Sequence, residues 1–220
     1  MASIAENIRV IRETMAQAAK AAGREPSEVL LCAATKMNDV LGENRVQEMT
    51  EKLSQNAYDG APLHFIGHLQ RNKVKQVVGK VDLIESVDRM ELLECIEKTA
   101  AKLGIVQPIL LEINIGAEES KSGFSQEEIW QTVEKMADFP HCRLRGLMAI
   151  PPISLHPGDN RRYFAEMRNL FVDISEKKYD NVNMECLSMG MSGDYADAIA
   201  EGATMIRVGT AIFGPRNYNV

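Results

Sequence analysis

The segment PILLEINI, residues 108–115, decides the fold class. It is short and apolar at nearly every position, without the strict alternation of a half-exposed strand, so it predicts a strand buried on both faces. Segments 88–104 and 125–139, on either side of it, show the spacing of amphipathic helices. A buried strand between two helices is typical of a parallel sheet covered by helices.

The same alternation runs through the chain from end to end. Capping boxes (Ser3 with Glu6, Ser125 with Glu128) and Asp88 indicate helix starts, and Gly104 indicates a helix end. Eight strands with intervening helices predict an α/β protein with a single (β/α)₈ barrel of the TIM type over residues 1–220, preceded by an extra N-terminal helix. The expected strands are 29–35, 41–44, 63–67, 80–86, 108–115, 142–150, 185–190 and the start of 204–214. The expected helices are 3–22, 46–53, one beginning in 68–78, 88–104, 125–139, 160–178 and 194–202.

The pattern breaks between Lys36 and Gly42, where only five residues separate two expected strands. A parallel crossover needs about a dozen residues or more, usually including a helix. Either the barrel is broken at this point or a segment is missing from the sequence. We favour a missing segment, because every other unit is complete, and we expect a chain break between these two residues.

Composition excludes several function classes. The chain of 220 residues has a net charge of −6 and an isoelectric point near 5.4, which argues against a nucleic-acid-binding protein. It has no stretch approaching the ~18 apolar residues of a membrane span, and the N-terminus does not resemble a signal peptide. The four cysteines are scattered without a Cys-x-x-Cys pair. We therefore expect a soluble cytoplasmic protein with reduced thiols.

A lysine, Lys36, follows the first buried strand. In a (β/α)₈ barrel the carboxyl ends of the strands form the functional face. An amine at such an apolar mouth is desolvated, which lowers its pKa and favours attack on an aldehyde. The alternative is a lysine that only extends into solvent.

Two glycine-containing loops predict a phosphate site. Ser192 and Gly193 follow the seventh strand, and Gly209 and Thr210 follow the eighth. Loops after strands seven and eight are the usual phosphate site of this barrel, since their free N–H groups and hydroxyls bind anions. Asp194 opposes this interpretation unless its carboxylate turns away to cap the next helix. Together with the amine, the loops describe a pocket for a phosphorylated aldehyde, of which pyridoxal 5′-phosphate is the obvious example.

Several ordered motifs carry a family resemblance. The segments ATK, GENRVQE, HFIGHLQRNK, SKSGF, RGLMAIPP and 187–214 are similar to the pyridoxal phosphate homeostasis proteins, the YggS/PROSC family, which is related to the N-terminal barrel of alanine racemase. The resemblance covers residues 4 to 218 and implies a fold-type III barrel that holds the cofactor as a reversible Schiff base on Lys36. It further implies phosphate binding by Ser192, Gly193, Gly209 and Thr210, an arginine (Arg207) near the pyridine nitrogen, and Asn44 as a pocket residue. Members of the family have a helix between the lysine and GEN, and this sequence lacks it.

The resemblance implies a function in intracellular vitamin B6 homeostasis, without catalysis. A cation at the ring nitrogen disfavours the pyridinium form, so the cofactor becomes a weaker electron sink. We expect a monomer that buffers the cofactor or delivers it to apoenzymes as transient partners. The alternative is an amino-acid racemase-like enzyme, which needs a second acid or base opposite Lys36, with Tyr195 as the candidate. A third interpretation is a barrel that serves only as an interaction protein.

Two further motifs have weaker functional interpretations. His64 and His68 flank a short strand, where their spacing does not favour a metal site, so we expect no metal. The SKSGF loop, residues 120–124, is polar and is expected to be an ordinary barrel loop.

Overall fold

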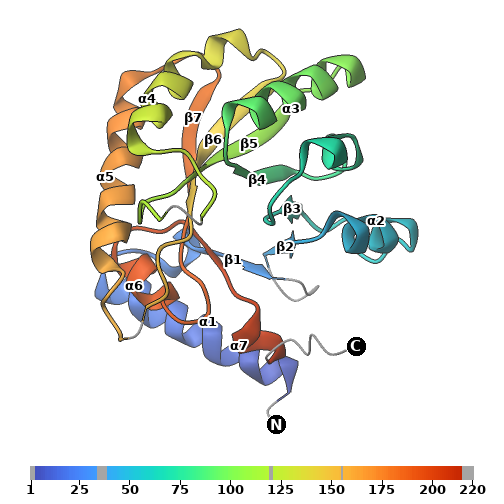
Figure 1. Ribbon diagram of the computed structural model, residues 1–220. Helices are drawn as coiled ribbons and strands as arrows, with labels where there is room; N and C mark the ends of the chain where they lie inside the picture. Colours follow the sequence, from blue (N-terminus) through green and yellow to red (C-terminus); the bar gives the residue numbers. More distant parts are fainter. Residues whose placement is uncertain (1–2, 34–38, 119–120, 155, 215–220) are drawn as a thin grey trace.

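Eight parallel strands form a closed barrel in which each strand pairs with the next and β8 pairs with β1 (Figure 1). The computed structural model describes residues 3–33, 39–118, 121–154 and 156–214. Helices lie outside the barrel, so the predicted (β/α)₈ architecture is confirmed. The strands are β1 (Leu30–Ala33), β2 (Val40–Glu43), β3 (Leu63–Phe65), β4 (Leu83–Val87), β5 (Gln107–Ile113), β6 (Cys142–Ala149), β7 (Val182–Ser188) and β8 (Met205–Arg207).

The helices follow the predicted order, with the extra helix at the N-terminus. In the described residues they are α1 (Ile4–Ala21), α2 (Val46–Ser54), α3 (Met90–Leu103), α4 (Gln126–Glu134), α5 (Arg161–Lys177), α6 (Tyr195–Ala200) and α7 (Thr210–Phe213), with 3₁₀ turns η1 (Pro26–Glu28), η2 (Arg71–Gln76) and η3 (Met136–Asp138). Helix α1 packs against α6 and α7, so the first helix lies beside the last two. None of the helices in the described ranges is long and apolar enough to cross a lipid bilayer.

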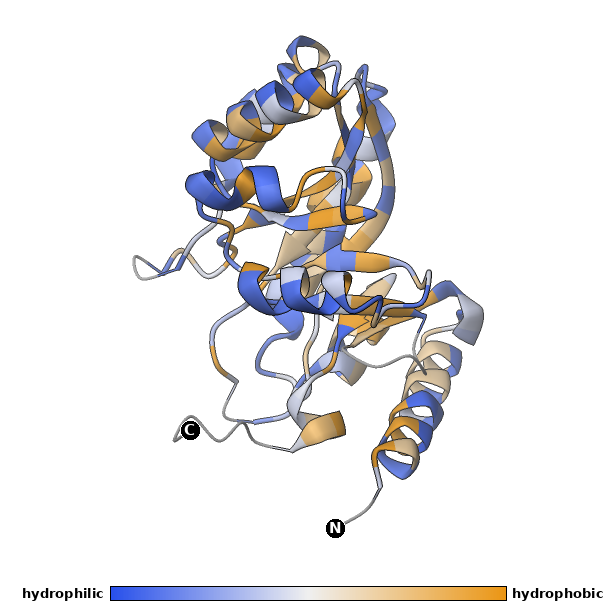
Figure 2. Cartoon of the chain, turned by 90° about the vertical axis from the view of Figure 1, so that its right-hand side faces the viewer, coloured by the Kyte–Doolittle hydropathy of each residue, from blue (hydrophilic) through white to orange (hydrophobic). Residues whose placement is uncertain are grey.

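The core has two layers, because side chains of a strand alternate between its two faces. The outer layer lies between strands and helices and joins strand residues such as Ile84 and Leu111 to helix residues such as Ile96 and Phe164. The inner layer fills the barrel and contains Leu83, Leu110 and Met148 in one cluster and Cys32, Val40 and Met205 in another. Figure 2 shows strands that are largely hydrophobic and helices that carry hydrophobic and hydrophilic residues side by side.

Some expected helix starts differ from the observed ones. The segment 68–78 forms the 3₁₀ turn η2 instead of an α-helix; no side chain caps its start, and Gly79, at φ +76°, follows it closely. Helix α3 begins after Arg89, and the Asp88 carboxylate contacts Arg89 and His68 instead of capping the helix. At α1 only Ser3 caps, since the Glu6 carboxylate binds Arg9. The capping box of Ser125 and Glu128 is confirmed.

The connection between β1 and β2 is short. β1 ends at Ala33 and β2 begins at Val40, and the two strands pair in parallel. The expected chain break falls largely on residues 34–38, outside the described residues. The Asp39 carboxylate accepts a hydrogen bond from the Leu31 N–H (2.9 Å) and pairs with Arg12 of α1 (3.1 Å). The start of β2 is thereby tied to the start of β1.

Gly146 tests how tightly the strands pack. Gly146 and Gly158 both have a positive φ, +146° and +90° respectively. A Cβ added at Gly146 would lie 1.8 Å from the carbonyl oxygen of Cys186 in β7, whereas a Cβ added at Gly158 would meet nothing within 4 Å. We expect Gly146→Ala to lower the free energy of unfolding by about 2 kcal/mol more than Gly158→Ala, because both substitutions strain the backbone but only the first collides with a neighbouring strand. Urea unfolding of both variants measures the difference. An equal loss of unfolding free energy in the two variants would contradict the close approach of Gly146 to the Cys186 carbonyl.

Candidate functional site

A buried arginine lies inside the barrel at the carboxyl end of β8. Arg207 is 6% exposed and follows the inner-layer residue Met205 by two positions, so its side chain points inward. Its Nη1 donates to Ser188 Oγ (2.6 Å) and its Nη2 donates to the Ala149 carbonyl (2.9 Å). The guanidinium is therefore fixed by β6 and β7.

A glutamate balances the charge of this arginine. Glu85 of β4 is fully buried, and its Oε2 lies 4.0 Å from Arg207 and accepts a hydrogen bond from Ser188 Oγ (2.6 Å). Its Oε1 lies 2.7 Å from His64 Nδ1. Burial opposes ionisation, but the hydrogen bond and charge of His64, with Arg207 and Ser188, hold the pKa of Glu85 below its ordinary value. The carboxylate is therefore ionised and accepts from the His64 ring, so four strands contribute to one connected network.

The two predicted phosphate loops meet beside this network. Ser192 Oγ, after β7, accepts a hydrogen bond from the Ala211 N–H at the start of α7 (3.2 Å), which joins the loops. The backbone N–H groups of Ser192, Gly193, Gly209 and Thr210 donate no hydrogen bond to any residue that the structure describes. A Cβ on either glycine would meet nothing within 4 Å. Backbone N–H groups without an acceptor in the described part of the protein are suited to binding an anion.

Asp194 lies in the same loop as Ser192 and Gly193, and its carboxylate is held by two hydrogen bonds. Its Oδ1 accepts from the Met191 N–H of that loop (2.7 Å), and its Oδ2 accepts from Nδ2 of Asn160, the residue before α5 (2.8 Å). The predicted capping of α6 by this carboxylate is not observed, since α6 has no side-chain cap.

The GEN motif contains a residue that holds α2 against β2, Glu43, and a predicted pocket residue, Asn44. Glu43 is buried and binds Lys52 (2.6 Å) and Tyr58 (3.0 Å), so it attaches α2 to β2. Asn44 follows at the end of β2 and is exposed. Its backbone lies against Gly67, where a Cβ would come within 2.0 Å of the Asn44 carbonyl oxygen. The structure thus places Asn44 at the carboxyl end of its strand, on the same end of the barrel as Arg207.

Lys36 lies outside the described residues. The strand before it is described, and Cys32 of β1 is the register partner of Arg207. The chain therefore leaves β1 next to the arginine. All the other predicted site residues (Asn44, Ser192, Gly193, Arg207, Gly209 and Thr210) are brought to this end of the barrel, which we call the mouth.

Glu112 of β5 is a further acidic group inside the mouth. It is 8% exposed, and its carboxylate makes no hydrogen bond or ion pair with the described part of the chain. Burial first, and then the nearby Asp88 carboxylate, raises the pKa of Glu112 to about 7, while Arg207 opposes the shift. A carboxyl of this kind can change its charge near neutral pH.

The SKSGF loop holds β5 at the same place. Phe124 N–H donates to the Glu112 carbonyl (2.8 Å), and Asn114 N–H donates to the Phe124 carbonyl (3.0 Å). Asn114 Nδ2 also donates to the Glu118 carbonyl (2.8 Å), so the loop is anchored to the end of β5. Lys121 in this loop pairs with Glu118 and donates to the Pro151 carbonyl (2.9 Å).

The two histidines have separate partners. His64 belongs to the Glu85 network, and His68 lies 3.1 Å from Asp88. Within the described ranges no group of three or more histidine, cysteine or acidic side chains could hold a metal ion. Tyr195, the residue considered as a second acid or base, begins α6 and packs half-buried against the outer core.

Sequence reasoning missed the network of His64, Glu85 and Ser188, and it missed Glu112. A signal for three of them exists, because His64, Glu85 and Glu112 are polar residues within short strands that are otherwise mostly apolar. A buried polar group is costly unless it is paired, so such residues indicate internal partners or a ligand.

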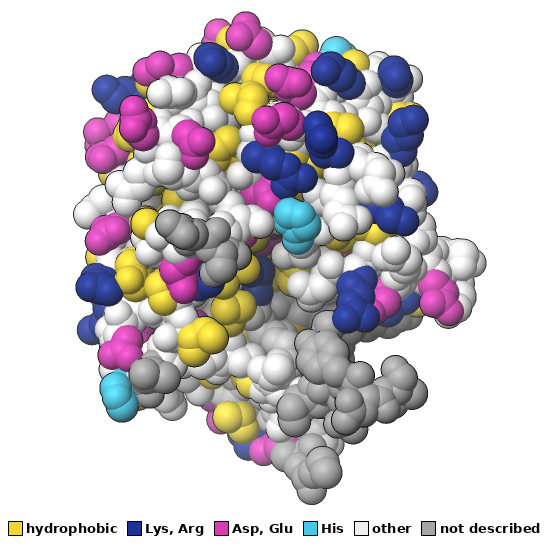
Figure 3. Space-filling view, viewed as in Figure 1, with side chains coloured by type: hydrophobic (Ala, Val, Ile, Leu, Met, Phe, Trp, Pro, Cys, Tyr) yellow, Lys and Arg dark blue, Asp and Glu magenta, His cyan; other side chains and the backbone are white. Residues whose placement is uncertain are grey.

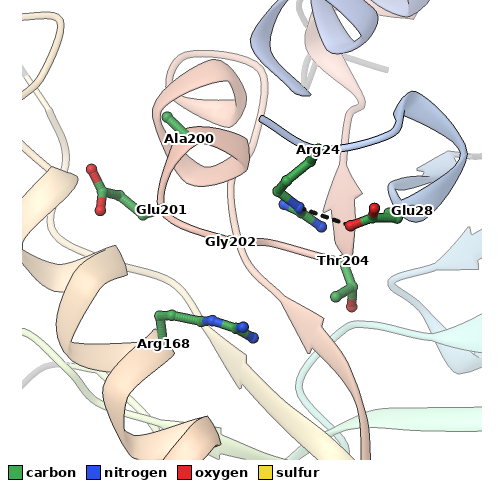
Figure 4. A pocket seen from close by; sticks show the side chains of 7 residues that line it. All are labelled: Arg24, Glu28, Arg168, Ala200, Glu201, Gly202 and Thr204. Carbon is green, nitrogen blue, oxygen red and sulfur yellow. Dashed lines mark hydrogen bonds and ion pairs between the residues drawn. The ribbon is translucent and has the colours of Figure 1, made fainter. Parts of the chain in front are cut away.

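A cavity lies at the end of the barrel opposite the mouth. Figure 3 shows a hollow near the centre of one face, with hydrophobic side chains along one side of it. A cavity of about 330 Å³ lies before the start of β8 instead, lined by Arg24, Glu28, Arg168, Ala200, Glu201, Gly202 and Thr204 (Figure 4). There Arg24 binds Glu28 (3.1 Å) and the Ala203 carbonyl (2.8 Å). None of the predicted site residues lines this cavity, and that end of a (β/α)₈ barrel serves stability.

The fold and the polar mouth match a known class of proteins. Residues 1–217 match the family described as alanine racemase, N-terminal domain. Within that class the chain belongs to the pyridoxal phosphate homeostasis protein family, as the following relatives show.

Two relatives with that name and one solved structure are similar over most of their length. The protein of Aquifex aeolicus (strain VF5) is 46% identical over 179 residues, which are 81% of this chain and 78% of that protein. The protein of Pseudomonas aeruginosa is 36% identical over 232 residues, covering 99% of this chain and 98% of that protein. The structure of PipY from Synechococcus elongatus PCC7942 with PLP bound has a TM-score of 0.79 and 28% identity, covering 96% of this chain and all of PipY.

Ser188 links the two buried charges, so its removal is informative. We expect Ser188→Ala to lower the free energy of unfolding by about 1–3 kcal/mol, because Glu85 and Arg207 each lose a buried hydrogen bond. Ser175→Ala is the control, since that exposed hydroxyl binds only the Val172 carbonyl of its own helix. Denaturant unfolding measures both variants, and a loss no larger than that of the control would show that the link does not stabilise the barrel.

Proposed function

We propose that this chain binds pyridoxal 5′-phosphate in the mouth of the barrel, takes part in cofactor homeostasis, and is not an enzyme. The observation that carries the proposal is that the backbone N–H groups of Ser192, Gly193, Gly209 and Thr210 donate to none of the residues that the structure describes. These donors fit a phosphate, and the buried Arg207 beside them fits an electron-rich ring nitrogen. PipY, the similar protein, has PLP bound in its solved structure.

Each residue of the proposed site has its own role in holding the cofactor. The four N–H groups and the hydroxyls of Ser192 and Thr210 hold the phosphate. Arg207, fixed by Ser188 and the Ala149 carbonyl, keeps a positive charge at the ring nitrogen, and Asn44 lines the pocket. Lys36 supplies the amine that holds the aldehyde reversibly. When bound, the cofactor supplies a reactive aldehyde and an electron-withdrawing ring.

Holding without turnover agrees best with the residues at the mouth. The positive charge at Arg207 opposes protonation of the ring, which weakens carbanion chemistry. Tyr195, the candidate second base of a racemase-like enzyme, packs against the outer core. The relatives are named for homeostasis. The proposal includes release of the cofactor to apoenzymes as transient partners, with the chain acting as a monomer in the cytoplasm.

Lys36 gives the direct test. We expect the purified protein, loaded with pyridoxal 5′-phosphate and dialysed, to be yellow, and borohydride to fix the cofactor on Lys36, as located by mass spectrometry. Lys36→Ala should lose the visible band, because no other amine is expected to hold the aldehyde, whereas Lys73→Ala on η2 should keep it. A colourless wild type, or attachment at a different lysine, would contradict the proposal.

We also propose that a crossover segment is missing between Lys36 and Gly42 of an otherwise single-domain barrel. The alignment with the Pseudomonas aeruginosa protein extends over 232 residues, although this chain has 220, so that relative has residues without a counterpart here. The short β1–β2 connection is where a helix would belong.

Mass measurement decides this second proposal. We expect the protein isolated from its native source to have an intact mass clearly above the 24.5 kDa of this sequence, with the additional residues mapping between Lys36 and Gly42 in a peptide digest. A mass of 24.5 kDa and a peptide that runs uninterrupted through this region would exclude a missing segment.

A further inference from the structure

Glu112 faces the inside of the barrel. Its register partner on β6 is Met148, which belongs to the inner layer together with Leu110, two positions before Glu112 on the same strand. Met148 in turn pairs with Ser188 of β7. Glu112, Met148 and Ser188 therefore form one row around the wall, and Arg207 is bound to the last member of that row.

The other charges around Glu112 are already paired. Glu85 of β4 is bound by His64 and Ser188, and Asp88, which follows β4, contacts Arg89 and His68. From β8, Arg207 is held beside Glu85, and in the loop after β5, Lys121 pairs with Glu118. β6 places the uncharged Met148 next to it. In the described part of the chain, Glu112 is thus a carboxyl more than nine-tenths buried, directed into the mouth, and without a partner.

An unpartnered buried carboxyl responds strongly to a ligand. Removing water from the mouth and adding a negative group both disfavour the carboxylate form. The proposed ligand brings a phosphate, and the donors for that phosphate lie on the β7 and β8 loops of the same mouth. Arg207, whose charge lowers the pKa of Glu112, also lies 4.0 Å from Glu85.

We propose that Glu112 is a binding determinant that takes up a proton when the anionic ligand binds, so that its side chain is a neutral carboxylic acid in the complex. This inference rests on the proposed function, and it adds that the affinity for pyridoxal 5′-phosphate depends on pH through one carboxyl. The proton comes from solvent and binds to a carboxylate oxygen, and no other bond changes.

The direction of the pH dependence follows from linkage. Below about pH 7 Glu112 is largely protonated with or without ligand, so it contributes no pH dependence. Above that pH the free protein loses the proton while the loaded protein keeps it, so affinity falls, by up to ~10-fold per pH unit, until the pKa of the loaded state is passed.

Proton uptake is measured by titration calorimetry of the ligand-free full-length protein with pyridoxal 5′-phosphate. Titrations at about pH 7.5 in PIPES and in imidazole, neither of which is a phosphate or a primary amine, give the number of protons exchanged. We expect the wild type to take up about 0.7 proton more than Glu112→Gln, since about three-quarters of this carboxyl is ionised at that pH. Pyridoxine 5′-phosphate, which lacks the aldehyde, repeats the comparison without chemistry at Lys36.

Controls separate this inference from the proposed function. Glu118→Gln removes a carboxylate from the loop at the mouth and should leave proton uptake at the wild-type value. Equal uptake by wild type and Glu112→Gln, with binding intact, would overturn the inference alone. Absence of binding by the wild type would overturn the proposed function and the inference together.

A measurement on the wild type covers the case in which Glu112→Gln does not fold. Carbon-13 NMR of the labelled glutamate carboxyls should show one group titrating near pH 7 in the free protein and moving to higher pH with pyridoxine 5′-phosphate bound. No carboxyl with an elevated and ligand-dependent midpoint would reject the inference.

Discussion

The compensation of one buried positive charge constrains the interior of this barrel. Arg207 is almost entirely removed from water, and a charge in that position requires an opposite charge and complete hydrogen bonding. Glu85 supplies the opposite charge, and Ser188 is hydrogen-bonded to both Arg207 and Glu85. His64 contacts the second oxygen of the Glu85 carboxylate. Because these residues come from β3, β4, β7 and β8, the network fixes the relative positions of strands that are distant along the chain.

The network neutralises the charge of Arg207 and Glu85 but does not include Glu112, another buried acidic residue of the mouth. Arg207 and Glu85 form a nearly neutral pair, and the N–H groups of the last two loops donate to no residue that the structure describes. Glu112 is the first member of the row that continues with Met148 and Ser188, and its carboxylate has no partner among the described residues. A ligand with a phosphate at one end and an amine-reactive carbon elsewhere is suited to this arrangement, since its negative group finds donors and the remaining carboxyl can be neutralised by a proton.

The sequence was sufficient for the order of strands and helices, because hydrophobic periodicity is a local property. It was also sufficient for the loop residues Ser192, Gly193, Gly209 and Thr210, which a barrel necessarily brings together after β7 and β8. It was insufficient for Glu85 and Glu112, since the direction of a side chain depends on strand register. The register of β4 and β5 shifts between Ile84 and Val87, so counting alternate residues fails there. The 3₁₀ turn at 71–76 was predicted as a helix because its polar residues also suit the start of an α-helix.

The junction of the first and last elements has a consequence for the order of folding. Asn7 Nδ2 of α1 donates to the Ile212 carbonyl of α7 (2.9 Å), a contact between residues 205 positions apart, and β1 pairs with β8. Closing so long a loop is slow, and during synthesis it must wait for the final strand to leave the ribosome. The free N–H groups on the last two loops acquire their positions only then. A nascent or truncated chain thus lacks the paired loops of the proposed phosphate site, which form only in the finished polypeptide.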